Sequence, residues 1–211
     1  WPRLSQVYDT LVRRAETPLS RANILMRHAQ LLEERAKDVN SALARASLAF
    51  QVDPGYEPAY GEATRLATVA QAHEALIGLY ERRADAELAV DARLDALLAA
   101  ARCAFSALED ALRATSYLAR GVLLVNGDAA LLDRIEQHAA TLDEEDPPPT
   151  GQGLVHALSE TYAREAQEGR HRLDLTILLW TRAAVLRERA LNDLAGAYAA
   201  REQANVYRKK F

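Results

Sequence analysis

Hydrophobic residues recur at helical spacing through most of the chain. Apolar side chains three and four residues apart, as at Leu4, Val7, Tyr8 and Leu11, are typical of amphipathic helices. Breakers and capping residues interrupt this pattern at intervals, for example at Thr17-Pro18, which suits the N-cap and first position of a helix. The pattern predicts eleven helices, at about 2–15, 18–36, 39–51, 57–70, 72–86, 91–107, 110–124, 129–143, 152–168, 171–190 and 192–210.

The pattern also repeats. A shift of 72 residues aligns pairs along the first two thirds of the chain, and a further shift of 82 residues continues the series at Leu158, Tyr162, Leu179 and Ala183. We therefore expect one repeat domain over 1–211, with copies at roughly 1–72, 73–144 and 152–211. The extra ten residues fall in the proline-rich stretch DEEDPPPTGQG (143–153), which predicts an inserted, solvent-exposed loop. The aligned pairs include Leu4/Leu76, Tyr8/Tyr80, Arg21/Arg93, Ala42/Ala114 and Gly55/Gly127.

Composition supports an all-α fold and narrows the classes of partner. Half of the residues are apolar, mostly Ala and Leu, and only 6% are aromatic. The formal net charge of −4 comes from acids and bases spread along the chain, which gives no overall field for nucleic acid or an anionic membrane. We expect no membrane insertion, because no run of about 18 apolar residues is present.

The spacing of small residues and breakers carries a family resemblance. Ala42, Ala46, Ala49 and Pro54 stand at positions 20, 24, 27 and 32 of a 34-residue unit, as in the second helix and turn of a tetratricopeptide (TPR) repeat. The second copy has Ala114, Leu118, Gly121 and Asn126 at the same positions. The stretches WPRLSQVYD (1–9) and HEALIGLYE (73–81) resemble the pattern of half-TPR (HAT) repeats.

The chain thus resembles the tetratricopeptide family over nearly all its length, with HAT-like alternate hairpins. The resemblance implies a right-handed α-solenoid of antiparallel helix hairpins, a superhelix with a concave binding face. The small residues at positions 20 and 27, namely Ala42, Ala49, Ala114 and Gly121, are expected at close helix contacts and nearly inaccessible to solvent.

Motifs for chemistry are missing from the sequence. The five histidines form no HExxH pair, and the single cysteine, Cys103, excludes a CxxC site. The GxG at 151–153 follows no strand and precedes no Lys-Ser/Thr, so it does not predict a phosphate loop. We expect a non-catalytic protein with neither a cofactor nor a metal.

The family resemblance also implies which residues contact a partner. In the family, positions 2, 5, 9, 12 and 13 of the first helix in each hairpin line the concave groove. Those positions mix charges of both signs with a few large side chains, which suits recognition of a peptide or a helix. For Trp180, the alternative is the core between helices. The candidates are Asn23, Met26, Gln30, Glu33, Glu34, Arg65, Leu98, Arg102, Phe105, Asp133, Gln137, Trp180, Arg187 and Glu188.

These observations favour a scaffold that binds a protein or peptide within a larger, bacterial-type assembly, in the cytoplasm. An RNA-associated HAT-like array and a regulatory ligand-sensing repeat are the alternatives. Apolar stripes on the first and last helices indicate that neither is a dedicated cap. We therefore expect that the chain is a segment of a longer repeat protein, or that its end helices associate with another chain or with a second copy.

Overall fold

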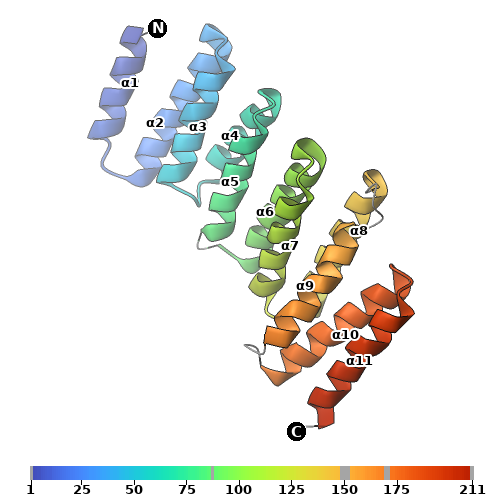
Figure 1. The fold of residues 1–211 in the computed structure, drawn as a ribbon. Coiled ribbons are helices and arrows are strands. Elements are labelled where there is room, and N and C mark those ends of the chain that lie inside the picture. Colours follow the sequence, from blue (N-terminus) through green and yellow to red (C-terminus); the bar gives the residue numbers. More distant parts are fainter. Residues whose placement is uncertain (1, 87, 148–152, 169–171, 210–211) are drawn as a thin grey trace. The chain divides into compact units, whose positions relative to one another are not determined.

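The computed structural model describes residues 2–86, 88–147, 153–168 and 172–209, and these form helices and turns without a strand (Figure 1). The all-α prediction is confirmed, and each helix lies within two residues of its predicted bounds when two π-helical turns, η1 (Leu32–Ala36) and η2 (Cys103–Ala107), are counted with the helices they extend. The helices are α1 (Pro2–Arg14), α2 (Pro18–Leu31), α3 (Val39–Val52), α4 (Glu57–Val69), α5 (His73–Asp85), α6 (Val90–Arg102), α7 (Ala111–Val125), α8 (Ala129–Glu145), α9 (Leu154–Glu168), α10 (Leu173–Arg189) and α11 (Leu194–Lys209).

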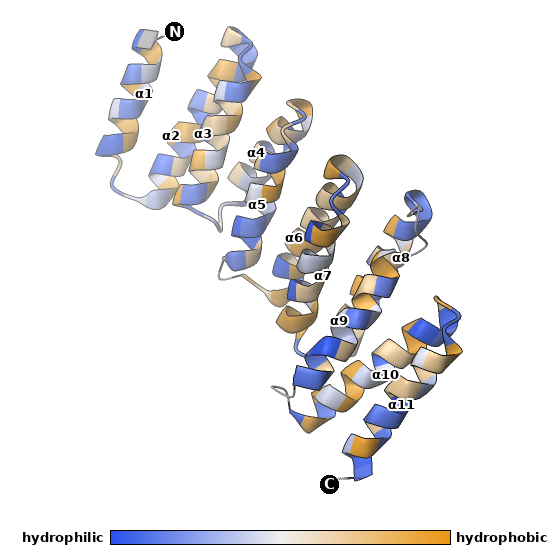
Figure 2. Ribbon diagram, in the orientation of Figure 1, coloured by the Kyte–Doolittle hydropathy of each residue, from blue (hydrophilic) through white to orange (hydrophobic). Residues whose placement is uncertain are grey.

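The chain divides into two compact units, Trp1–Ala96 and Leu97–Phe211, and the division falls within α6. In the first unit, each helix from α1 to α4 packs against the next one along the chain. In the second unit, α7, α8 and α9 pack on one another, and α10 packs against both α9 and α11. Figure 2 shows polar and apolar residues alternating along each helix, as amphipathic helices require.

The 72-residue period is visible in the backbone. Helices α2, α3 and α4 begin at 18, 39 and 57, and α6, α7 and α8 begin 72 residues later, at 90, 111 and 129. Both α3 and α7 start with an aspartate N-cap: the Asp38 carboxylate accepts from Ser41 N at 3.0 Å, and that of Asp110 accepts from Arg113 N at 2.9 Å. The two copies therefore share the same N-cap as well as the same spacing between helix starts.

The preceding helices also end alike. Both α2 and α6 widen into a π-helical turn, and a left-handed residue follows, Lys37 with φ 57° and Glu109 with φ 53°. Asp38 N donates to Leu32 O at 3.0 Å, and Asp110 N donates to Ala104 O at 2.9 Å, which satisfies carbonyls that a helix end leaves free.

Small residues let neighbouring helices approach closely. Ala42, Ala49 and Ala114 are fully buried, and Gly121 is buried as well, as predicted. In the first unit α3 packs on α2, and Phe50 of α3 contacts Tyr60 of α4 with tilted rings at 5.3 Å between centroids.

Turn chemistry separates these helices. After α3, the Asp53 carboxylate accepts from Gly55 N at 3.2 Å, and α4 starts two residues later with Pro58 in its first turn. The predicted loop at 143–153 differs at its start, because α8 continues to Glu145 and Asp143 binds the first turn of α9. Residues 148–152 of that loop lie outside the described residues.

Candidate functional site

In the first unit, the candidate residues lie on α2 and α4, the first helices of two successive hairpins. Arg65 on α4 reaches back to η1, the turn that extends α2, where its guanidinium contacts Glu33 at 2.5 Å. It also binds Glu62 on its own helix at 2.7 Å. Tyr56, just before α4, donates its hydroxyl to Asn23 on α2 at 2.7 Å. Two separate polar contacts, Tyr56 with Asn23 and Arg65 with Glu33, therefore involve three of the predicted residues.

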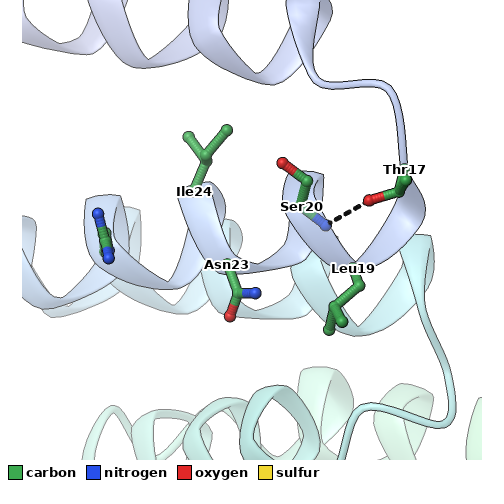
Figure 3. Close-up of a pocket in the computed structure, with 6 residues that line it drawn as sticks. Thr17, Leu19, Ser20, Asn23 and Ile24 are labelled. Atoms are coloured by element: carbon green, nitrogen blue, oxygen red, sulfur yellow. Dashed lines mark hydrogen bonds between the residues drawn. The ribbon is translucent and has the colours of Figure 1, made fainter.

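The other candidates on α2 and η1 are exposed or half-buried. Gln30 and Glu34 are exposed, and Met26 is half-buried. A shallow hollow of about 370 Å³ runs along the first turns of α2 and includes Asn23 (Figure 3). In that view Asn23 and Leu19 point to one side of the helix and Ile24 to the other, so the hollow wraps around α2 and is not an enclosed cavity. Its lining residues are Thr17, Leu19, Ser20, Asn23, Ile24 and Arg27.

In the second unit, a hollow of about 240 Å³ lies between α6 and α8, the first helices of two hairpins. Two predicted residues line it, the buried Leu98 from α6 and the exposed Gln137 from α8. Arg102, also predicted, crosses from α6 to Glu145 at the end of α8 at 3.0 Å. The hollow thus has an apolar floor and polar walls. The remaining lining residues are Arg134, His138 and Thr141.

His138 links the two helices that line this hollow. Its Nε2 lies 2.9 Å from the carbonyl oxygen of Leu98, so Nε2 carries the hydrogen and donates it. Burial lowers the pKa of His138, and the nearby Arg102 guanidinium lowers it further. The imidazole is therefore neutral near pH 7, and Arg134 and Arg102 bring positive charge to this region.

Sequence reasoning missed Arg134, His138 and Thr141. They stand at i, i+4 and i+7 on α8, a row of helical neighbours one position away from the predicted pair Asp133 and Gln137. That row is legible in the sequence. The positions implied by the family resemblance, Asp133 and Gln137, each precede a residue of that row by one position.

Three of the large candidates are buried. Leu98, Phe105 and Trp180 each expose less than a tenth of their surface. Leu98 nevertheless reaches the floor of the hollow between α6 and α8. Trp180 Nε1 has no hydrogen-bond partner.

The charged candidates on α8 and α10 form ion pairs. Arg187 binds Glu160 on α9 at 2.5 Å, and Glu188 binds Arg201 on α11. Asp133 binds Arg182, which sequence reasoning did not select. These pairs join α10 to its neighbours in the second unit.

Arg182 lies at the centre of a half-buried polar cluster. Besides Asp133, it binds Glu136 at 3.2 Å and donates to the Ala129 carbonyl at 3.1 Å. The Tyr162 hydroxyl donates to Glu136 at 3.1 Å. Burial raises the pKa of Glu136 above its ordinary value and also raises that of Tyr162. A half-buried charge is costly without a partner, so this cluster stabilises the packing between α8, α9 and α10 only while its charges stay paired.

A serine–histidine contact joins α1 to α2. Ser5 Oγ lies 3.2 Å from Nε2 of the buried His28, and Tyr8 stacks on the same ring at 4.6 Å. His28 Nδ1 has no hydrogen-bond partner, whereas a triad needs a carboxylate there. Among the described residues, no group of His, Cys, Asp and Glu side chains could hold a metal ion, and no helix is long and apolar enough to cross a membrane.

Comparison with known proteins adds no relative to these observations. No family model, no curated protein and no solved structure matches this chain.

Proposed function

We propose that this chain is a non-catalytic helical-repeat scaffold that binds a protein segment along the first helices of its hairpins. The observation that carries the proposal is the hollow between α6 and α8, where Leu98 forms an apolar floor below Arg134, Gln137 and His138. A few polar groups above an apolar floor suit a peptide side chain or backbone, because they orient a ligand while apolar contact supplies affinity.

The chemistry of the hollow defines the peptide. Arg134 lines it, Arg102 lies near it in an ion pair with Glu145, and the neutral His138 adds no charge. A segment with an apolar anchor beside an acidic residue fits this set. The polar residues Asn23, Glu33 and Arg65 in the first unit are the second expected contact surface.

The RNA-binding alternative is weaker. Of the basic pairs in the sequence, Arg82-Arg83 contributes little free charge, because Arg83 is buried and binds Glu57 at 2.5 Å. An RNA interface needs exposed cations that reach phosphates. The ligand-sensing alternative needs an enclosed cavity, whereas the hollows described here are shallow.

The test is selection of peptides from a random display library with the full chain as bait. We expect enriched peptides that combine an apolar and an acidic residue. Their affinity should fall about tenfold or more in an Arg134→Glu variant, which reverses a charge beside the apolar floor. Leu112→Ser is the control, since Leu112 is exposed on α7 and lines neither of the hollows described above.

A salt titration of binding to single-stranded RNA distinguishes the RNA-binding alternative from the scaffold proposal. A steep fall of affinity with salt, unaffected by Arg134→Glu and accompanied by no peptide selection, contradicts the scaffold proposal in favour of phosphate contacts. Peptides that bind the wild type and Arg134→Glu equally contradict the proposed location.

A further inference from the structure

The outer face of α1 carries an exposed apolar row. Leu4, Val7 and Leu11, hereafter the α1 stripe, have 37%, 54% and 45% of their surface exposed. They stand three and four residues apart and therefore share one side of the helix. Other side chains of α1 point toward α2, where Tyr8 stacks on His28.

The repeat provides a reference for this face. The α5 residues 72 positions after the stripe are Leu76, Leu79 and Arg83, and all three are less than a tenth exposed. In the third copy, Leu158 and Thr161 on α9 are buried as well. The same helix face is thus covered in two copies and open in the first.

The covering helix is visible in both internal copies. Helix α4 packs on α5, where Tyr60 lies 6.5 Å from Tyr80 and 4.2 Å below the Arg83 guanidinium. Helix α8 packs on α9 through the contact of Glu136 with Tyr162. Buried residues of α4 are mostly small, namely Ala59, Ala63, Leu66 and Ala67, which lets the two helix backbones approach closely.

Charge defines what fits on the α1 stripe. Arg3, Val7, Leu11 and Arg14 are spaced four, four and three residues apart, so two exposed arginines bracket the stripe at its ends. The acid of α1, Asp9, already binds Arg45 on α3 at 2.7 Å. The covering helices carry acids instead: Glu57 on α4 binds Arg83 of α5, and α8 carries a longer series.

We propose that the α1 stripe is a docking surface for an amphipathic helix of a protein partner, with small apolar residues on one face and acids beside them. The helix lies antiparallel on α1, as α4 lies on α5. This surface is separate from the proposed peptide site, because it is on the first helix of the chain and not on α2, α4, α6 or α8.

A second copy of this chain fits the surface less well. Two α1 helices packed antiparallel bring Arg3 of one close to Arg14 of the other, and like charges at close range are destabilising. The stripe has three side chains, whereas a stable dimer buries about 800 Å² from each partner. On α11, the position of Phe50 and Val122 holds the buried Ala204, with the exposed Arg201 and Arg208 one turn to either side, so α11 has no large apolar side chain at that position.

The binding test uses a peptide of residues 53–72 of this chain, which contains α4, labelled with fluorescein. Its fluorescence anisotropy is measured with the full chain. We expect binding that weakens about tenfold in the Val7→Asp variant, because a carboxylate replaces an apolar contact. A peptide that carries both Glu57→Lys and Glu62→Lys should bind the wild-type chain more weakly than the unmodified peptide does. Leu112→Ser is the control and should bind like the wild type.

A linked version makes a weak contact measurable, since an isolated helix of this length is largely unfolded. Residues 38–72 are fused ahead of the full chain, which reproduces the connection between α4 and α5. Amide exchange at Leu4–Leu11 should slow and Tm should rise, and Val7→Asp in the fusion should remove both effects. Unchanged exchange in the fusion, or peptide binding that Val7→Asp leaves intact, overturns the proposal. A dimer of the unfused chain that Val7→Asp converts to a monomer also overturns it, because the occupant is then a second copy.

Discussion

The Asp143 carboxylate, near the end of α8, caps the start of α9 by accepting the backbone N–H of Leu154 at 2.7 Å. Its second oxygen accepts from Val155 N at 2.9 Å. The first N–H groups of a helix have no partner within the helix, and the cap usually comes from the residue just before it. Here the cap comes from eleven residues earlier, so it closes the proline-rich insertion at its base.

Asp143→Ala should lower the free energy of unfolding by about 1 kcal/mol, since it removes an N-cap. Urea denaturation followed by circular dichroism measures the change. Glu144→Ala is the matched control, because Glu144 is the exposed neighbour on the same helix. Equal effects of the two substitutions would show that the cap adds nothing to stability.

Ala49→Leu should lower the free energy of unfolding by roughly 1–3 kcal/mol, because the added side chain overpacks a fully buried helix contact. Ala44→Leu, on the exposed side of α3, should change it by less than about 0.5 kcal/mol. Thermal unfolding of both variants tests the register of the repeat. Similar melting temperatures for the two variants count against a close contact at Ala49.

Helix positions and the buried small residues were predictable because both follow from local rules. Breakers such as Pro18 and Pro54 mark helix limits, and the 72-residue shift identifies Ala42 and Ala114 as the same structural position. The π-helical turns at Leu32 and Cys103 were not predicted, because their i to i+5 bonding leaves no mark in apolar spacing.

The candidate site was only partly predictable, because side-chain direction depends on tertiary packing. Leu98 and Phe105 have the helix positions that line a groove in the family, yet both are buried. The cluster around Arg182 joins residues up to 53 positions apart, from Ala129 to Arg182, and no local pattern connects them. Long-range ion pairs of this kind become visible only when the helices are in place.

Arg182→Leu should be strongly destabilising, by about 3 kcal/mol near neutral pH, because it leaves the Glu136 carboxylate half-buried without its cation. Burial already raises the pKa of Glu136, and loss of Arg182 raises it further. A carboxyl group with a raised pKa in the folded state costs stability above that pKa, and the cost disappears as the pH falls and the group takes up a proton. The difference from wild type should therefore shrink in acid. Arg172→Leu, which breaks an exposed pair with Asp174, is the control and should have little effect at any pH.

His28 should make the stability of the chain fall as the pH drops below about 6.5. Burial lowers the pKa of His28 from its ordinary value of 6.5, the Arg45 guanidinium lowers it further, and the Asp9 carboxylate opposes them in part. Between the lowered pKa and 6.5 the unfolded chain binds a proton at this residue that the folded chain does not, so the contribution of neutral His28 is complete above 6.5 and is lost toward the lowered pKa. His28→Phe preserves a ring against Tyr8 and removes the titration, so urea denaturation from about pH 7 to about pH 5 should give a shallower slope for this variant. Burial lowers the pKa of His138 as well, so part of the slope should persist in His28→Phe and disappear in the double variant His28→Phe, His138→Phe. A slope that is the same in the wild type and in His28→Phe would place the titration elsewhere in the chain.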